Sequence, residues 1–242
     1  MVERPERCLL CEARTNNPVC QLPTPSVLKF AEVARNLSFH HGQPIFQQGD
    51  PAGDVVLIRF GSIKLTHEHA DGAEQILRIA GPGETLGIGM SVGSTLLATA
   101  TARGSVSICR IALHEVERIV KDDPEFALAW AHLLMDEIQR ARTSVLHLGP
   151  HPAGVRLARF LVDSLEQTKP RRDAVVPTLY LTHAEIASTI AIAEETSTRL
   201  LRDLEEKNIL RLARGRIEII DLDRLVALAG YRGTFSDPLL AS

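Results

Sequence analysis

The sequence has few aromatic residues, no long apolar run and no excess of basic residues. Aromatic side chains make up 4% of the 242 residues, and the formal net charge is −3. Charge or glycine interrupts every apolar run before the roughly 18 residues that a membrane helix needs. Met1–Arg7 leads into cysteines instead of the apolar part of a secretory signal. We therefore expect a cytoplasmic protein without a membrane partner. The missing basic excess argues mildly against a nucleic-acid-binding protein.

Enzyme motifs are also missing. The sequence contains no glycine-rich phosphate loop, no H-E-x-x-H, no G-x-S-x-G and no paired-carboxylate constellation. Hydrophobic residues make up 45% and charged residues 24%, which is the composition of a globular chain. We do not expect an enzyme. A small redox enzyme that uses its cysteines stays open as the least favoured alternative.

Only four cysteines are present, but three of them crowd together near the N-terminus. Cys8, Cys11 and Cys20 follow a C-x2-C-x8-C pattern, and Cys109 lies far along the chain. In a reducing compartment such a cluster more often binds metal or does redox chemistry than forms disulfides. Four thiolates suit a tetrahedral zinc ion or a [4Fe-4S] cluster, and the spacing does not choose between them. The other interpretation is a flexible tail plus one buried strand cysteine.

Residues from Leu37 to about Ile111 show the pattern of short strands separated by glycine. Segments such as Val55–Phe60 and Ser62–Thr66 lie between glycine-containing turns, with Gly61 between these two segments. Turns about every ten residues, with short strands between them, are typical of an antiparallel barrel or roll.

After the roll, apolar residues recur with the period of a helix over about 24 residues. It begins after Asp122-Asp123-Pro124, where aspartate can cap and proline suits the first turn, and it runs to Leu148. Apolar residues recur at alternating spacings of four and three, the a/d pattern of a two-stranded coiled coil. We expect this seam to form a dimer interface. The alternative is that the seam residues pack on the roll and form no dimer interface. However, Phe126, Trp130 and Leu133 lie on another face of the same helix and could make the contact with the roll. The seam residues are Ala127, Ala131, Leu134, Ile138, Ala141, Val145 and Leu148.

The glycine- and proline-rich segment 149–154 reads as a hinge, and a DNA-binding pattern follows it. Val155–Gln167 is an amphipathic helix and Thr178–Leu181 a short strand. Thr182 and Glu185 then have the spacing of a capping box that opens a helix through Thr189. A second helix over Glu194–Lys207 and a two-stranded hairpin over 208–220 complete a winged helix-turn-helix.

With these segments in this order, nearly the whole chain resembles the bacterial family of the cyclic-AMP receptor protein and the fumarate-nitrate reduction regulator (CRP/FNR). The resemblance implies an α+β fold and a homodimer that binds a double-stranded DNA operator, with RNA polymerase as a further partner. It divides the chain into a cysteine-rich cluster-binding tail (1–25), an antiparallel β-roll sensor domain like those that bind cyclic nucleotides (26–121), a dimerisation helix (122–148), a hinge (149–154), a winged helix-turn-helix domain (155–232) and a C-terminal tail (233–242).

The cyclic-nucleotide-binding members carry a G-E-x-x-G-E cassette followed by Arg-Ser-Ala. This chain keeps Gly83-Glu84 and Gly87, but Ile88 stands in place of the second glutamate and Leu96-Leu97-Ala98 in place of Arg-Ser-Ala. Without that arginine, burying the cyclic phosphate would be costly. We therefore expect no cyclic nucleotide as ligand.

The oxygen-sensing branch has three clustered N-terminal cysteines and a fourth at the end of the roll, where Cys109 stands. This resemblance implies that Cys8, Cys11, Cys20 and Cys109 hold a [4Fe-4S] cluster that senses oxygen or nitric oxide. The gap between Cys11 and Cys20 is longer than in the best-known members. A heme- or zinc-dependent regulator on the same scaffold is the alternative, with His67, His69 or His114 as possible ligands.

Family members read DNA with the second helix of the motif, through a glutamate and an arginine four residues apart. Glu195 and Arg199 match these positions, and Thr198 stands where the oxygen-sensing branch commonly has serine. Arginine can bind guanine in a bidentate manner, and glutamate can accept from cytosine. The resemblance favours a TTGAT-like palindromic half-site. Ser197 and Thr182 complete the candidate DNA-binding set. The alternative for Glu195 and Arg199 is an ordinary surface ion pair.

In this branch the cluster orders the tail against the roll and favours the paired form, and its loss shifts the balance towards monomers. Some oxygen sensors place an acidic residue in the seam, which disfavours pairing. This seam has Ala141 and no acid, with Asp136 and Glu137 to one side. We therefore predict that the cluster-free protein still dimerises appreciably.

Overall fold

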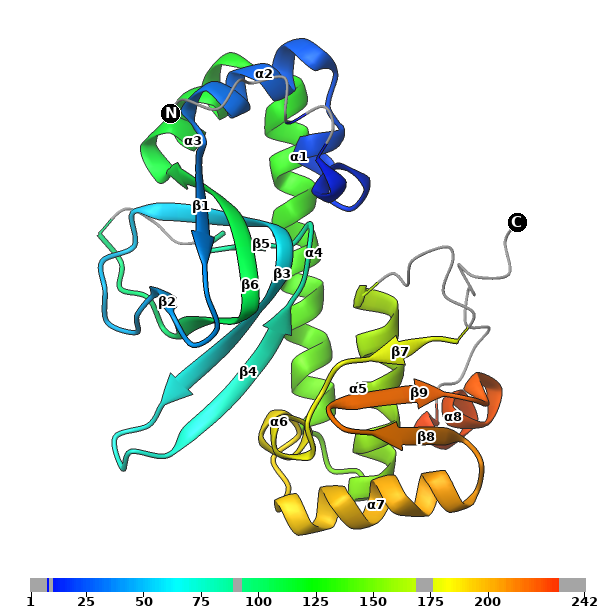
Figure 1. The fold of residues 1–242 in the computed structure, drawn as a ribbon. Coiled ribbons are helices and arrows are strands. Elements are labelled where there is room, and N and C mark those ends of the chain that lie inside the picture. Colours follow the sequence, from blue (N-terminus) through cyan, green and yellow to red (C-terminus); the bar gives the residue numbers. More distant parts are fainter. Residues whose placement is uncertain (1–7, 9–10, 89–92, 169–175, 231–242) are drawn as a thin grey trace. The chain divides into compact units, whose positions relative to one another are not determined.

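The structure is a computed structural model that describes residues 8, 11–88, 93–168 and 176–230 (Figure 1). The chain forms two compact units, Met1–Arg142 and Thr143–Ser242. The division falls inside the long helix, ahead of the segment 149–154 that the sequence analysis interprets as a hinge. The predicted tail 233–242 lies outside the described residues, as do 1–7, 9 and 10 of the predicted N-terminal tail. No helix in the described parts of the chain is long and apolar enough to cross a membrane.

The first unit contains the predicted antiparallel roll. The strands are β1 (Arg35–Phe39), β2 (Pro44–Phe46), β3 (Asp54–Glu68), β4 (Glu74–Ala80), β5 (Thr85–Leu86) and β6 (Thr99–Ala112). The sheet has the order β1-β6-β3-β4, with β2 paired to β6 and β5 paired to β3, and every pairing is antiparallel.

Gly61 does not separate two strands. The segments predicted as separate strands form the single strand β3, which continues through Gly61 while its register with β6 shifts on both sides of Phe60. Gly61 has a φ of +82°, and a Cβ atom there would lie 2.3 Å from the carbonyl oxygen of Ser105. Only glycine tolerates this approach and this backbone region, so the residue forms a β-bulge and not a turn.

Alternate residues of β3 and β6 face two different hydrophobic cores, because successive strand side chains point to opposite sides. Val56, Ile58 and Ile108 belong to the roll core, which lies inside the sheet. Leu57 and Ile111 belong to the helix-side core, where the other face of the sheet meets the helices of the first unit. The helix-side core consists of Ala13, Val19, Cys20, Phe30, Val55, Leu57, Ile88, Cys109, Ile111, Leu113, Val116, Ile119, Phe126, Ala129 and Leu133.

The N-terminal segment is folded and not a loose tail over its described residues. It forms a 3-10 helix η2 (Glu12–Thr15), α1 (Pro18–Gln21) and α2 (Thr24–Val33), and α3 (Leu113–Asp122) follows β6. Figure 1 shows α2 and α3 close together, beside the start of α4 (Pro124–His147). The sequence pattern predicts α4 with nearly these bounds but neither α2 nor α3.

Asp123 joins α2 to the start of α4. Its buried carboxylate accepts from the Phe126 backbone N–H at 3.1 Å, which caps α4, and from the Ser26 hydroxyl at 2.8 Å. The Lys29 ammonium lies 3.1 Å away. These groups, the Phe126 amide foremost, hold the pKa of Asp123 below its usual range. The capping position of aspartate is thus confirmed, with α2 as a partner that the sequence does not reveal.

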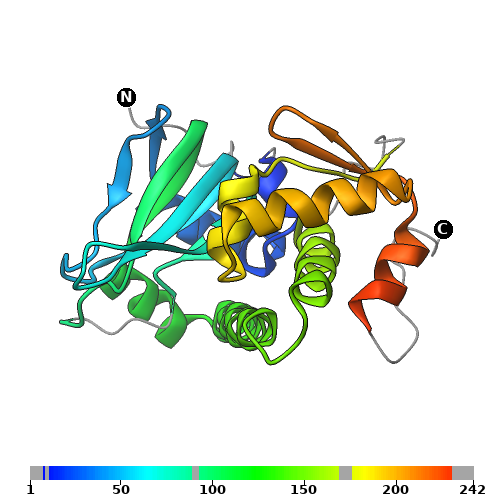
Figure 2. The ribbon, with the colours of Figure 1, turned by 90° about the horizontal axis from the view of Figure 1, so that it is seen from below.

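The second unit has the predicted winged helix-turn-helix. It consists of α5 (Ala153–Thr168), β7 (Thr178–Leu179), α6 (His183–Thr189), α7 (Glu194–Glu206), β8 (Leu210–Ala213), β9 (Arg216–Ile219) and α8 (Leu222–Ala229). The capping box is present, since the Thr182 hydroxyl accepts from the Glu185 N–H and the Glu185 carboxylate accepts from the Thr182 N–H. Figure 2 shows α6 at the start of α7 and the β8–β9 hairpin near its other end. The sequence analysis does not predict α8.

Candidate cysteine centre and nucleic-acid interface

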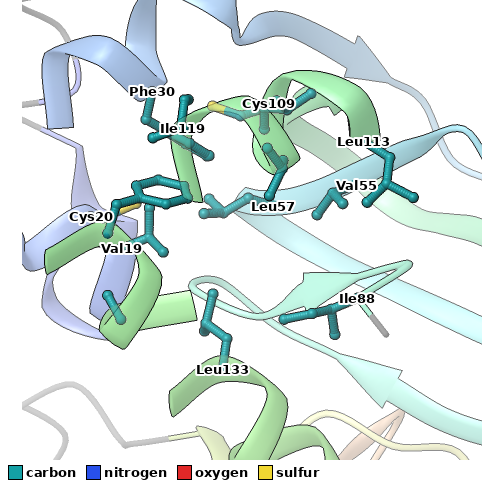
Figure 3. Close-up of a cluster of buried hydrophobic side chains, with 14 of the residues drawn as sticks. Val19, Cys20, Phe30, Val55, Leu57, Ile88, Cys109, Leu113, Ile119 and Leu133 are labelled. Atoms are coloured by element: carbon teal, nitrogen blue, oxygen red, sulfur yellow. The ribbon is translucent and has the colours of Figure 1, made fainter. Parts of the chain in front are cut away.

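All four cysteines carry free thiols in the first unit. Cys8 and Cys11 are half-buried in the N-terminal segment, while Cys20 in α1 and Cys109 in β6 are buried. Cys20 and Cys109 both belong to the helix-side core, and Cys11 packs against it. Figure 3 shows Cys20 and Cys109 among the side chains of that core.

Cys109 faces the helices and not the interior of the roll. It pairs with Leu57 across β3 and lies on the same strand face as Ile111, whereas its neighbour Ile108 points into the roll core. Its Sγ donates to the Asn36 Oδ1 at 3.2 Å. The fourth thiol is therefore on the side of the sheet where the other three lie.

The Cys20 thiol lies in an environment shared with the other three cysteines. Burial raises the pKa of Cys20 well above its usual range, and Cys109, Cys11 and Cys8 raise it further, in that order of size. Arg14 acts in the opposite direction. All four sulfurs are therefore close enough to interact electrostatically.

The thiols do not form a ready-made site for a single ion. Within the ranges that the structure describes, no three His, Cys, Asp or Glu side chains form a group that could hold a metal ion. A zinc ion needs each sulfur at about 2.3 Å from one central point. In a [4Fe-4S] cluster each thiolate binds a different iron, so the sulfurs stand farther apart.

The three histidines considered as ligands have other partners. His67 is half-buried with its Nδ1 2.7 Å from the Leu97 carbonyl oxygen, and the Nε2 of His69 lies 3.1 Å from the Gln75 side-chain oxygen. His114 is exposed beside Glu115. Nothing in their placement brings them to the cysteines.

The glutamate of the cyclic-nucleotide cassette is engaged by the protein itself. The Glu84 carboxylate accepts from the Arg78 guanidinium at 2.5 Å and from the Gly81 N–H at 2.7 Å. Arg78 also lies 3.1 Å from Glu137 on α4, which pairs in turn with Arg140 at 3.3 Å. The substituted position Ile88 is buried.

The helix α7 presents a charged face built as the sequence predicts. Glu195 and Arg199 are exposed on its outer side, and in the part of the chain that the structure describes neither has an ion-pair partner. The surface-pair alternative is therefore not what this conformation shows. Thr198 is half-buried, and its hydroxyl lies 3.0 Å from the Nδ1 of His183.

Two other members of the DNA-binding set have structural tasks. Ser197 is wholly buried, and its hydroxyl has no hydrogen-bond partner among the residues that the structure describes. It lies on the inner face of α7 with Leu201 and Leu204. This placement corrects the prediction that Ser197 contacts DNA, because a buried side chain does not reach a base edge. Thr182 is exposed, and its hydroxyl caps α6.

Two further arginines lie on or near α7 in the second unit and are not among the predicted DNA-binding residues. Arg202 lies three residues after Arg199, and Arg214 is in the turn of the β8–β9 hairpin. Both line a concavity of about 570 Å³ between α6, α7 and the hairpin. The i+3 spacing from Arg199 and the Arg214-Gly215 turn are the signals that would have found them. The concavity is lined by Leu181, Thr182, His183, Ala184, Glu194, Arg202, Glu205, Leu212, Ala213, Arg214, Gly215 and Ile217.

The helix α4 has two apolar faces. Phe126, Ala129 and Leu133 are buried in the helix-side core. The predicted seam lies on the other face, where Val145 is 68% exposed, Ile138, Ala141 and Leu148 are exposed, and Ala127, Ala131 and Leu134 are half-buried. Leu134 also packs against the helix-side core. Three exposed apolar residues that the seam pattern omits lie beside it: Leu128, Met135 and Leu146.

Comparison with known proteins agrees with this two-part organisation. Residues 36–123 match the cyclic nucleotide-binding domain, and residues 155–228 match the Crp-like helix-turn-helix domain. The chain is 27% identical over 224 residues to the nitrogen fixation regulation protein FixK of Bradyrhizobium diazoefficiens, covering 92% of this chain and 93% of FixK. It is 27% identical over 199 residues to the transcriptional activator protein Anr of Pseudomonas aeruginosa, covering 82% of each chain.

The solved structure of FixK2 from Bradyrhizobium japonicum has the same fold. It superposes with a TM-score of 0.73 at 24% identity, covering 83% of this chain and all of that one. The relatives are transcription regulators and not enzymes. A cyclic nucleotide-binding fold followed by a Crp-like helix-turn-helix makes this chain a DNA-binding transcription regulator of the CRP/FNR family.

Proposed function

We propose that this regulator is controlled by a [4Fe-4S] cluster bound to Cys8, Cys11, Cys20 and Cys109, and that it senses oxygen or nitric oxide. The observation that carries the proposal is that the three N-terminal thiols and the distant Cys109 share one neighbourhood on the helix side of the sheet. An all-cysteine ligand set is the usual one for such a cluster. The cluster supplies a centre that oxygen can destroy.

Each cysteine has a defined part in this proposal. Cys109 is fixed by the ladder between β3 and β6, so it provides a rigid ligand. Cys20 is fixed by α1, whereas Cys8 and Cys11 lie in the segment before it. Cys20 would bind iron as a thiolate, so its buried thiol would give up its proton on ligation. Ligation thereby ties the N-terminal segment to the sheet.

We further propose that a homodimer reads a TTGAT-like palindrome through Glu195 and Arg199, with no cyclic nucleotide as ligand and with RNA polymerase as a further partner. Regulators of this family are typically dimeric, and two recognition helices about 34 Å apart bind successive turns of DNA. The free charges of Glu195 and Arg199 support the contact to bases. The engagement of Glu84 by Arg78 supports the absence of a nucleotide.

The function is tested by DNA binding with and without oxygen. A duplex of sequence TTGAT-N4-ATCAA should be shifted by anoxically prepared protein, and exposure of the same sample to air should weaken the binding. The variant Cys109→Ser, prepared without oxygen, should behave like the air-exposed protein. If the wild-type protein bound this duplex equally well in both conditions, the cluster would not control DNA binding.

The apolar seam makes a separate prediction about the cluster-free protein. The exposed face of α4 carries Ile138 and Val145, Leu148 follows directly after the helix, and none of the seam positions is acidic, so pairing buries apolar surface without burying charge. Sedimentation velocity at micromolar concentration should therefore show an appreciable fraction of dimer. A clean monomer would contradict this prediction, and Ile138→Asp is the matched variant that should give one.

A further inference from the structure

Asn17 is a wholly buried polar residue that binds two parts of the first unit at once. Its side-chain oxygen accepts from the backbone N–H groups of Val19 at 3.1 Å and Cys20 at 3.3 Å, which caps α1. Its side-chain nitrogen donates to the Gly83 carbonyl at 2.8 Å and to the Thr85 hydroxyl at 3.0 Å. One amide therefore connects the helix of Cys20 to the turn between β4 and β5.

The segment and the turn also fit closely. Gly83 has a φ of +89°, and a Cβ atom there would lie 2.5 Å from the Cβ of Asn16. The turn therefore accepts the N-terminal segment only with glycine at this position. This is the turn that corresponds, by the resemblance, to the start of the cyclic-nucleotide cassette. Here a part of the protein's own chain rests on it.

The same turn contacts α4 through the residue between Gly83 and Thr85. The Glu84 carboxylate holds Arg78, and the Nε of Arg140 on α4 lies 3.9 Å from it. Arg78 reaches Glu137, also on α4, at 3.1 Å. The carboxylate and the Arg78 guanidinium are only 13% and 15% exposed, so their interaction is little weakened by water.

We infer that the Gly81–Thr85 turn acts as a relay, which means that it couples the position of the N-terminal segment with Cys20 to the position of the proposed dimerisation helix α4. Asn17 is the residue that positions the segment on this turn. When Asn17 makes its hydrogen bonds to Gly83 and Thr85, the turn is fixed next to the helix of Cys20. Glu84 then lies close to Arg78 of β4 and Arg140 of α4. When the segment leaves, the amide contacts to Gly83 and Thr85 are lost and the turn is released. The N-terminal segment thus does for this turn what a bound ligand would do.

Asn17 is a positioning residue, and its effect can be measured in the cluster-free protein. The rate at which N-ethylmaleimide modifies Cys20, followed by peptide mass spectrometry, reports whether the segment is docked, because Cys20 is buried. Asn17→Ala removes four hydrogen bonds, and we expect the rate to rise about tenfold or more. Gly83→Ala places a methyl group of the turn against Asn16, so it should disturb the same contact and raise the rate by a similar factor. The control Gln21→Ala removes an exposed hydrogen bond in the same segment and should change the rate less than about twofold.

The relay is tested by combining the two sides of the turn. Dimer dissociation constants from sedimentation are compared for Asn17→Ala, Glu84→Gln and the double variant, with circular dichroism to verify that each is folded. If the turn connects the two sites, the two effects are not additive. Additive effects would overturn the relay, and an unchanged Cys20 rate in both Asn17→Ala and Gly83→Ala would overturn the role of Asn17.

This inference depends on the proposed cluster only where it says what makes the segment dock. Both measurements use cluster-free protein, and iron content is determined separately on anoxic samples. A protein that never binds iron but shows the expected labelling and coupling would disprove the cluster and keep the relay. A protein that binds iron but shows neither effect would disprove the relay and keep the cluster.

Discussion

Replacing His147 by alanine is expected to destabilise the second unit by about 1–3 kcal/mol, because it removes a buried hydrogen-bond partner of the Asp163 side chain. The Nε2 of His147, at the end of α4, lies 2.6 Å from the Oδ2 of Asp163 on α5. Both residues are buried, and the His147 ring packs edge-on against Phe160 with the ring centroids 5.6 Å apart. The pair fixes the last turn of α4 to the first helix of the DNA-binding domain.

Hydrogen exchange in the full-length protein measures this effect locally. Exchange of the most protected amides of α5 should become faster by about tenfold or more in His147→Ala, as expected for a loss of that size. The matched control is His151→Ala, which removes an exposed histidine from the neighbouring segment and should leave the rates nearly unchanged. Asp163→Asn keeps the shape of the side chain and one hydrogen-bonding oxygen, so its effect on the exchange rates should lie between those of His147→Ala and His151→Ala. Equal exchange in the two histidine variants would show that the pair does not stabilise the unit.

Replacing Arg199 by alanine is expected to remove most operator specificity. A bidentate arginine–guanine contact contributes about 1–3 kcal/mol of discrimination. The proposed dimer makes this contact in each half-site, so affinity for the TTGAT palindrome should fall by about thirtyfold or more. Affinity for a scrambled duplex should change much less, because non-specific binding depends on phosphate contacts. Fluorescence anisotropy with both duplexes at one fixed salt concentration measures the difference.

Arg202 offers the matched comparison for Arg199. It lies on the same helix and lines the concavity beside the hairpin, where a phosphate contact is the expected role. Arg202→Ala should therefore weaken binding to the operator and to the scrambled duplex by similar factors, and it should reduce the salt dependence. If Arg199→Ala behaved in the same way, Arg199 would be a phosphate contact and the base contact assigned to it would be wrong.

The parts of the fold with a strong local signal are those that the sequence predicts. The helical period of α4 and the capping box at Thr182 depend on residues close together in the chain, and the structure confirms the helix and the capping box. Gly61 carries a turn signal that the long ladder between β3 and β6 overrides, since a bulge accommodates the glycine within the strand. The helices α2 and α3 have ten residues each, and α2 depends on Asp123, which lies 97 positions away from Ser26 in the sequence.

The residues of the candidate site also differ in whether a local pattern in the sequence predicts their placement. Ser197 is misassigned although its spacing of four from Leu201, itself three before Leu204, already indicates the inner face of α7. The side of β6 on which Cys109 lies follows from strand alternation only once the register with β3 is known. The Asn17 side chain contacts Gly83, which is 66 positions away, and Arg78, which holds Glu84, contacts Glu137, which is 59 positions from Arg78. No local pattern predicts these contacts.

We propose above that Cys8, Cys11, Cys20 and Cys109 bind one [4Fe-4S] cluster. The most direct test is the visible absorbance spectrum of full-length protein purified without oxygen, with iron, acid-labile sulfide and zinc measured on the same sample. We predict a brown protein with about four iron and four sulfide per chain, bleached by air, and a colourless Cys109→Ser variant. A colourless wild-type protein without iron, or one with a stoichiometric zinc ion in its place, would contradict the account.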